Sequence, residues 1–397
     1  KILYKLKEEY SIIIQNIIDS LYIKEKIEDA KGYMAKSDRF FYISGWISKS
    51  SIDRMDEILS KYEGILTVYK NGKDSVGLVP PTKLKNNSLF KPFETLIKMY
   101  GIPSYNELDP TPFLSLSYMF LFGAMFGDLG QGFVLLLGGI MLAKAMGNKV
   151  FGGLISRLGL SSMIFGTLYG AVFGFENVIP ALLIRPFENI NTILISAVAI
   201  GIALILISYI YGMVNSIKRK DVENGLFGKE GLAGFLFYLC LLTLAGGKFL
   251  NKNILPMGIG ILIIILSIAF MIFKEPLANL IIGRRPLHSE DISGYYIESI
   301  FSIVETLLSM LSGTVSFIRV GAFALTHVGL FIAFETIGKL IGTTAGNIIV
   351  LVIGNIIIIG LEGLIVFIQG LRLQYYELFS RYYEGEGREF KSINIRE

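Results

Sequence analysis

The chain has 397 residues, of which 52% are hydrophobic and 18% are charged, and its formal net charge is +4. Soluble domains usually carry about a quarter charged residues, and a positive charge this small and dispersed does not indicate nucleic-acid binding. A single cysteine, Cys240, excludes an internal disulfide, and only two histidines are present. We therefore expect neither a metal site nor a bound cofactor.

The first 110 residues are predicted to form a water-soluble, cytoplasmic α/β domain, because Lys, Glu and Asp are concentrated there. Apolar positions at helical spacing predict a helix within residues 1–36. Residues 40–43 and 65–69 are predicted strands, and a helix between them begins after Ser51. The chain opens in a helical pattern without a signal peptide, so we expect this domain to be truncated at its N-terminus.

Residues 111–397 are predicted to form a mainly α, eight-span polytopic membrane domain, because apolar stretches of about 20 residues can cross a bilayer. The stretch 111–143 is too long for one crossing, and we divide it at the glycine-rich turn 127–132. The last two segments are longer than a perpendicular crossing requires, so we expect them to tilt strongly. The other predicted spans are 158–175, 191–214, 232–250, 254–273, 295–338 and 344–382.

Lysine and arginine are concentrated in the loops that an even number of spans places on the side of the termini. This bias predicts that both termini are cytoplasmic. The loops on that side hold Lys144, Lys149, Arg157, Lys218, Arg219, Lys220, Lys229, Lys274, Arg284 and Arg285, whereas the opposite loops hold Arg185, Lys248, Lys252 and Lys339.

The last two predicted spans carry charged side chains where a charge is expensive. Arg319 lies near the centre of its span and has no short route to the membrane surface. We expect such residues to mark an ion pathway, and the alternative is a set of structural ion pairs between two helices. That alternative is favoured for Glu298, Glu335 and Arg381, because long side chains near span ends can reach the surface. The candidate pathway residues are Arg319, Arg372, Glu362, Glu305 and His327.

Helix geometry predicts an order for these residues across the membrane. Glu305 and Arg319 are fourteen residues apart, so at about 100° per residue they share roughly one helix face. If the last two spans are antiparallel and Arg319 lies level with Arg372, then Glu362 lies beside His327. This places a Glu/His pair on the outer side, two arginines near the middle and Glu305 on the cytoplasmic side. The arrangement resembles two polar half-paths that meet at a cationic barrier.

Three separated motifs stand out in the membrane part: FGAMFGDLGQG at 122–132, SFIRV at 316–320 continuing to His327, and LRLQYYELF at 371–379 followed by EGEG. Shorter motifs in the soluble part are ISGWI at 43–47, PPT at 80–82, MYG at 99–101 and DPTP at 109–112. In this order, nearly end to end, they resemble subunit a (also called subunit I) of V-type and archaeal-type rotary ATPases.

The resemblance implies a stator that faces a rotating proteolipid c-ring and couples translocation of H⁺ or Na⁺ to rotation. It implies contacts with the peripheral stalk and other ATPase subunits through the cytoplasmic domain, and a location in a prokaryotic plasma membrane. Arg319 matches the essential arginine of the ring interface and Arg372 the second arginine. Glu305, His327 and Glu362 match polar positions of the half-channels.

Two residues of the first motif are weaker candidates. Asp128 either satisfies amides in its glycine-rich turn or belongs to the channel. Gln131 stands where eukaryotic relatives usually have His, which weakens a proton-relay role there.

Two other functions remain open at this stage. The chain lacks a GxxxxGK[ST] phosphate-binding loop, so we expect it not to hydrolyse ATP itself. The alternative functions are a secondary ion-coupled transporter and a structural membrane scaffold.

Overall fold

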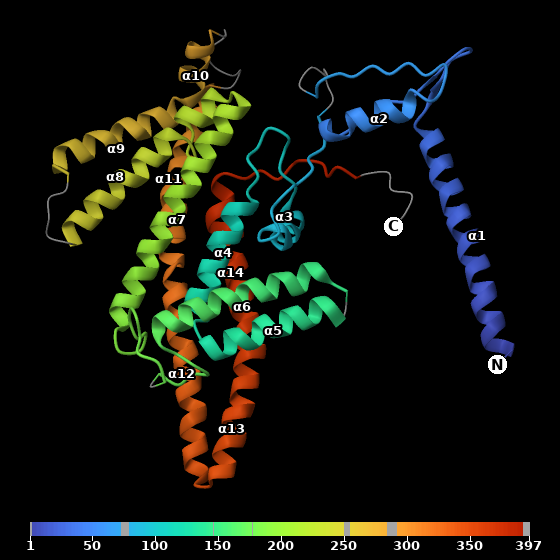
Figure 1. Ribbon diagram of the computed structural model, residues 1–397. Helices are drawn as coiled ribbons and strands as arrows, with labels where there is room; N and C mark the ends of the chain where they lie inside the picture. The colour runs from blue at the N-terminus through green and yellow to red at the C-terminus, as the bar shows by residue number, and fades with distance from the viewer. Residues whose placement is uncertain are drawn as a thin grey trace. The chain divides into compact units, whose positions relative to one another are not determined.

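The computed structural model describes residues 2–72, 79–145, 147–176, 178–249, 255–283 and 292–391 (Figure 1). The chain divides into two compact units, one of Lys1–Lys83 with Arg388–Glu397 and one of Leu84–Gly387. Three residues that entered the orientation argument, Lys252, Arg284 and Arg285, lie outside the described residues.

The first unit is dominated by one long helix, α1 (Ile2–Gly32), whose apolar positions at helical spacing are exposed. β1 (Ala35–Lys36) pairs antiparallel with β2 (Phe41–Tyr42), so the predicted strand at 40–43 is reduced to two residues. A 3-10 turn, Lys49–Ser51, leads into α2 (Ile52–Leu59), which is the helix predicted after Ser51.

The predicted strand at 65–69 is wrong. These residues have no regular secondary structure, and Leu66 is 90% exposed. A strand needs a neighbouring strand to pair with and a layer that covers its apolar face. Within the described part of this unit, residues 65–69 have neither, so their β-forming composition is not sufficient.

The second unit contains the membrane helices. Five helical segments among the described residues are long and apolar enough to cross a membrane. A sixth results if α9 (Met257–Ile272) and α10 (Lys274–Ile282), which are bent by 72° relative to each other, count as one span. The five segments are Lys149–Tyr169, Ile190–Arg219, Glu223–Lys248, Ile292–Ile341 and Thr344–Arg381. They lie close to the predicted spans, whereas the two helices of the predicted first hairpin, α4 (Thr111–Met125) and α5 (Leu129–Ala145), are shorter than a crossing.

The remaining elements of this unit follow the chain. They are η2 (Lys91–Phe93), α3 (Glu94–Tyr100), α6 (Lys149–Tyr169), α7 (Ile190–Arg219), η3 (Glu223–Phe227), α8 (Leu232–Phe249), α9 (Met257–Ile272), α10 (Lys274–Ile282), α11 (Ile292–Ser316), α12 (Ile318–Ile341), α13 (Thr344–Ile357), η4 (Ile358–Glu362), α14 (Gly363–Arg372), η5 (Leu373–Leu378) and η6 (Phe379–Arg381).

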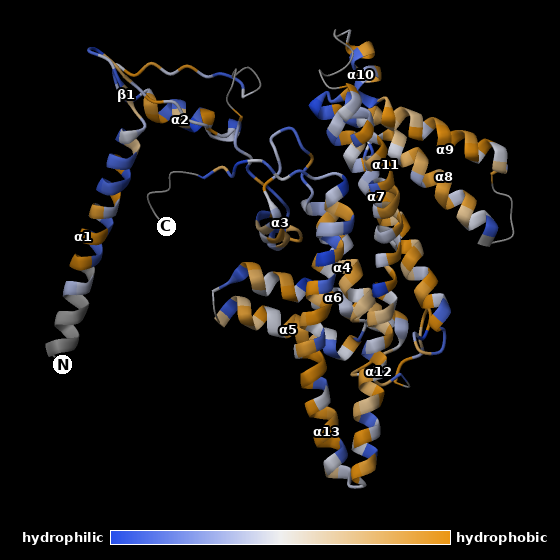
Figure 2. Ribbon diagram, turned by 180° about the vertical axis from the view of Figure 1, so that it is seen from behind, coloured by the Kyte–Doolittle hydropathy of each residue, from blue (hydrophilic) through white to orange (hydrophobic). Residues whose placement is uncertain are grey.

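Three pairs of consecutive helices pack against each other: α5 with α6, α8 with α9, and α12 with α13. α7 runs beside α11 and α12, while the α5–α6 pair lies across the long direction of α12 and α13 (Figure 1). Apolar residues dominate the helices of this unit, and hydrophilic residues gather at their ends (Figure 2).

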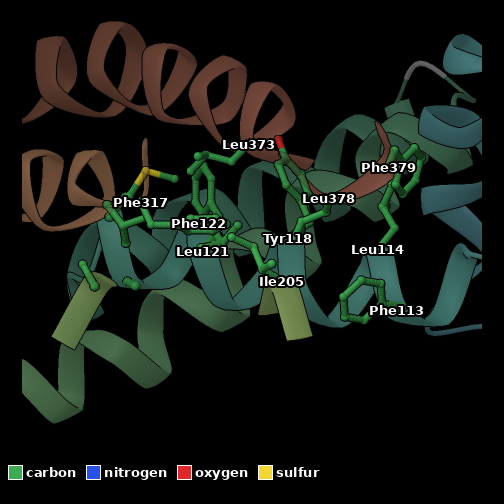
Figure 3. Packing of buried hydrophobic residues seen from close by; sticks show 14 of the residues in the cluster. Phe113, Leu114, Tyr118, Leu121, Phe122, Ile205, Phe317, Leu373, Leu378 and Phe379 are labelled. Carbon is green, nitrogen blue, oxygen red and sulfur yellow. The ribbon is translucent and has the colours of Figure 1, made fainter. Parts of the chain in front are cut away.

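The core of the unit is built around the short helix α4. Its Leu114, Tyr118, Leu121 and Met125 are fully buried. Figure 3 shows several of these side chains packed with residues of α7 and the C-terminal helices. A helix that is apolar on every side favours burial in a protein or a membrane. α4 packs against α6, α12 and α14, and only its Leu116 and Phe120 are exposed.

The two long C-terminal segments are interrupted where the candidate residues lie. α11 ends at Ser316 and α12 begins at Ile318, one residue before Arg319. In the last segment, the π-helical turn η4 ends at Glu362. A second π-helical turn, η5, begins directly after Arg372. Single π-turns inside α-helices occur frequently at functional sites.

Candidate functional site

His327 of α12 and Glu362 of η4 form a buried pair. The two residues are 3% and 4% exposed, and His327 Nδ1 lies 2.9 Å from Glu362 Oε2. The antiparallel register predicted from the sequence places these two side chains side by side, and the structure confirms that pairing. An imidazole and a carboxylate in direct contact can exchange a proton.

Each residue of this pair has a second polar side-chain atom that can bind another ligand. Among the described residues, neither His327 Nε2 nor Glu362 Oε1 has a hydrogen-bond partner. Buried polar atoms in proteins are nearly always satisfied by protein or by ordered water. The two free atoms therefore favour water or a transferred ion at this site.

The turn between α4 and α5 contacts the same region. The Phe126 ring packs edge-on against His327, with centroids 4.8 Å apart. Gln131 Nε2 donates to Asn355 Oδ1 at 2.9 Å, and Asn355 precedes Glu362 by seven residues, about two helical turns. A side-chain amide does not gain or lose a proton near neutral pH. Gln131 can therefore bind water or an ion but cannot relay a proton by changing its own charge.

Asp128 has a structural position. Its buried carboxylate accepts hydrogen bonds from the backbone N–H groups of Gln131 (2.8 Å), Phe173 (2.9 Å) and Gly174 (2.6 Å). Phe173 has a φ of +48°, a left-handed conformation that is rare outside glycine. Of the two roles considered for Asp128, this geometry favours the one in which it satisfies turn amides, and it also fixes the loop after α6.

Arg319 is half-buried in the first turn of α12, and Arg372 is exposed at the end of α14. Arg319 interacts electrostatically with Arg372 and with Glu377, a buried carboxylate on η5. Glu377 also interacts electrostatically with Arg372 and Arg381. One carboxylate is therefore the shared counter-charge of three guanidinium groups.

Glu377 was not among the predicted site residues, although it lies inside the third motif. Its spacing contained a signal. Glu377 follows Arg372 by five residues, which is the hydrogen-bonding interval of a π-helix rather than an α-helix. Arg372 directly precedes the π-helical turn η5, and Glu377 lies within it. An analysis that assumes α-helical periodicity puts these two side chains on different faces.

Glu305 is exposed on α11 and lines a cavity of about 190 Å³. A larger cavity of about 620 Å³ adjoins it, bounded by the end of α7, the segment before α8, α11 and the end of the last helix. Ser309 lines the smaller cavity, and Glu298 and Ser302 line the larger one. Glu305 thus lines a polar cavity, and neither His327 nor Glu362 lines this cavity or the larger one.

The three charged residues near the predicted span ends behave differently from one another. Glu335 forms an ion pair with Lys339 (2.7 Å), which is a structural role. Glu298 is exposed. The expectation that Arg381 reaches the membrane surface is wrong, because it is 7% exposed and donates from Nη1 to the hydroxyl of Tyr209 at 2.9 Å. The Tyr209 ring, 5.3 Å from the guanidinium carbon, also favours the buried position.

A polar cluster ties the segment before α4 to the chain after η6. Asn215 of α7 accepts from Leu108 N–H and donates to Tyr382 O, both at 2.9 Å. Glu107 is buried beside it and accepts from the backbone N–H of Glu384 at 3.3 Å. Burial raises the pKa of the Glu107 carboxyl. Sequence patterns did not identify this cluster, because its members are more than 100 residues apart.

This cluster also contains an ion pair. Arg219, at the end of α7, pairs with Glu384 and lies 4.0 Å from the Glu107 carboxylate. This ion pair holds the chain just after η6 against the end of α7.

The long apolar helices define a polytopic helical membrane protein, and a buried ionisable pair lies in its interior. Residues 6–174 and 283–395 match the V-type ATPase 116kDa subunit family. The chain belongs to this family.

Curated relatives agree with this assignment. The chain is similar to the A-type ATP synthase subunit I of Saccharolobus solfataricus, with 28% identity over 96% of this chain and 64% of that protein. It is 27% identical to the subunit I of Methanocaldococcus jannaschii, over 94% of this chain and 58% of that protein. For the subunit I of Pyrococcus horikoshii the identity is 26%, over 90% and 54%. The chain therefore spans between about half and two thirds of the length of these relatives.

Proposed function

We propose that this chain is the membrane stator of a rotary ATPase of the A/V type, and that its last two helical segments provide two half-paths for H⁺ or Na⁺ at a proteolipid ring. The observation that carries the proposal is the buried His327–Glu362 pair on the same two segments as Arg319 and Arg372. Family membership and the names of the relatives support it.

The outer half-path contains His327 and Glu362, and the inner half-path contains the cavity beside Glu305. Arg319 separates them. A guanidinium remains protonated even when partly buried, so it can pair with an ionised ring carboxylate and favour loss of the ion that carboxylate carries. Its charge also opposes a continuous leak between the two half-paths.

The proposed topology has eight crossings, with α4 and α5 as a short first hairpin and both termini in the cytoplasm of a prokaryotic cell, bounded by its plasma membrane. The positive charge at the end of α7, where Lys218 and Arg219 lie in the last turn, supports this orientation. Single cysteines at Lys218 and Lys248, both exposed, should then be labelled from opposite sides of the membrane. Labelling of both positions from the outside of intact cells would contradict the topology.

The proposed partners follow from the proposed role. They are the proteolipid ring in the bilayer, and the peripheral stalk and other ATPase subunits at the first unit. ATP hydrolysis then belongs to other subunits.

Arg319→Ala tests the function. In complexes reconstituted into vesicles, this variant should lose coupled ion pumping while assembly and ATP hydrolysis are retained. Arg319→Lys should also fail or nearly fail, because a buried ammonium can deprotonate and lacks the planar fork of a guanidinium. Pumping at a near wild-type rate by assembled Arg319→Ala complexes would refute the barrier mechanism. Loss of assembly would favour a structural ion pair instead.

A further inference from the structure

The two cavities beside α11 share part of their lining. Five residues line both of them: Lys229, Glu230, Thr306, Ser380 and Arg381. Glu305 and Ser309 line only the smaller cavity, whereas Ser302 lines only the larger one. A solute that moves from the larger cavity towards Glu305 therefore passes these five side chains.

Arg381 is the fixed charge in the lining that the two cavities share. Lys229 and Glu230 are exposed, whereas Arg381 is buried and held at three points. Its Nη1 donates to the Tyr209 hydroxyl, its Nε donates to the backbone oxygen of Glu377 at 3.0 Å, and its guanidinium lies over the Tyr209 ring. An arginine held in this way keeps both its charge and its position.

The neighbouring helix leaves room for the guanidinium. A Cβ atom added to Gly313 of α11 would lie 3.0 Å from Arg381 Nη2. α11 therefore has a glycine at the point where the arginine side chain approaches it. The side chain occupies a space provided by α7, α11 and the last helix together.

We propose that Arg381 is a positively charged selectivity gate that keeps hydrated metal cations out of the smaller cavity. This inference rests on the proposed ion-path function and adds a selectivity step to it. A metal ion must bring its full charge, and part of its water shell, past a fixed guanidinium in a narrow space. A proton moves by transfer between water molecules and carboxyl groups, and carboxylates are present on both sides, with Glu298 in the larger cavity and Glu305 in the smaller. The ion that reaches Glu305 by this route is then a proton.

Charge-selective cysteine labelling tests the gate without any measurement of pumping. The only native cysteine of the chain is replaced, as Cys240→Ser, and either Ser309→Cys or Ser302→Cys is introduced into the assembled complex in detergent. Cationic and anionic methanethiosulfonates of similar size are then compared. The ratio of anionic to cationic labelling rates should be higher at position 309 than at position 302.

Arg381→Gln should lower the ratio at position 309 by about tenfold, which corresponds to about 1.4 kcal/mol, and should change it by less than about twofold at position 302, farther from the removed charge. Lys229→Gln is the matched control, because it removes an exposed positive charge that lines both cavities and should leave the ratio nearly unchanged. An unchanged ratio in Arg381→Gln would overturn the gate. Equal increases of both labelling rates would overturn it too, because the arginine would then only fill space.

Two further results keep the test independent of folding and of the proposed function. If Arg381→Gln does not assemble, raising the ionic strength around the complex with native Arg381 should lower the ratio at position 309, and a salt-independent ratio would overturn the gate. If Arg319→Ala complexes pump normally while Arg381→Gln still shifts the ratio, the gate stands and the stator function is wrong. If Arg319→Ala abolishes pumping while the labelling ratio at position 309 is the same with and without Arg381, only the gate is wrong.

Discussion

The His327–Glu362 pair allows a substitution that separates proton transfer from structure. Glu362→Gln keeps the shape of the side chain and an oxygen for the hydrogen bond, but it removes the group that can take up a proton. We expect assembled Glu362→Gln complexes to hydrolyse ATP while pumping is lost or strongly reduced.

The expected magnitudes differ between the two properties. The substitution converts a hydrogen bond to a charged group, worth about 1.5–3 kcal/mol, into a neutral one worth about 0.5–1.5 kcal/mol. The loss of stability should therefore be about 1 kcal/mol, even though the atoms are buried and only 2.9 Å apart. Removal of a positioned acid or base typically costs 10²–10⁴-fold in rate, so pumping should fall by at least about 100-fold.

The assay measures ATP-driven ion uptake, ATP hydrolysis and apparent melting temperature on the same vesicle preparation. Glu335→Gln is the matched control. It is the same substitution on α12, at a residue whose partner, Lys339, is exposed on the same helix. Helix ion pairs of this kind contribute only about 0.3–0.5 kcal/mol, so this variant should pump at a near wild-type rate.

Two outcomes would refute the reasoning. Near wild-type pumping by Glu362→Gln would exclude proton uptake at this carboxylate. A large fall in melting temperature that accompanies the loss of pumping would favour the structural ion-pair alternative.

Two other predictions concern stability. Because burial raises the pKa of Glu107 above its usual value of 4.5, the folded state binds more protons than the unfolded state. Its contribution is therefore fully favourable below pH 4.5 and is lost as the pH rises through the raised folded-state pKa. The apparent melting temperature of Glu107→Gln relative to wild type should then rise from pH 4 towards pH 7, and a difference that does not change over this range would contradict the cause assigned. A Cβ atom at Gly166 of α6 would lie 2.1 Å from Leu129 N, so Gly166→Ala should destabilise the chain by about 1–3 kcal/mol. Gly138→Ala in α5, with no atom within 4 Å of its added Cβ, should instead be neutral or stabilising by up to about 1 kcal/mol, and equal melting temperatures of the two variants would exclude the packing explanation.

The membrane helices and the central ion pair could be predicted because their signals are local or periodic. The predicted span 191–214 corresponds to α7, and the predicted span 344–382 corresponds to the segment Thr344–Arg381. Apolar length alone determines such helices. The pairing of His327 with Glu362 followed from two further assumptions, that the last two spans are antiparallel and that Arg319 lies level with Arg372.

The parts that could not be predicted depend on contacts between distant segments. The hydroxyl that binds Arg381 comes from Tyr209, 172 residues earlier in the chain. The amides of Phe173 and Gly174 reach Asp128 from a loop 45 residues away. Periodicity describes one helix at a time, so it cannot say which neighbour removes an arginine from the surface or satisfies a buried carboxylate. The strand predicted at 65–69 failed for the same reason, since a strand is stabilised by its partners.

The arginine cluster is itself short of negative charge. Among the described residues, Glu377 is the carboxylate whose charge acts on Arg319, while Arg372 adds a second positive charge beside it. In the part of the chain that the structure describes, Arg319 Nη1 is buried and has no acceptor. An unpaired buried donor costs about 1–3 kcal/mol, and a charged one costs more. Under the function proposed above, a carboxylate of the ring is the group that would supply the missing acceptor.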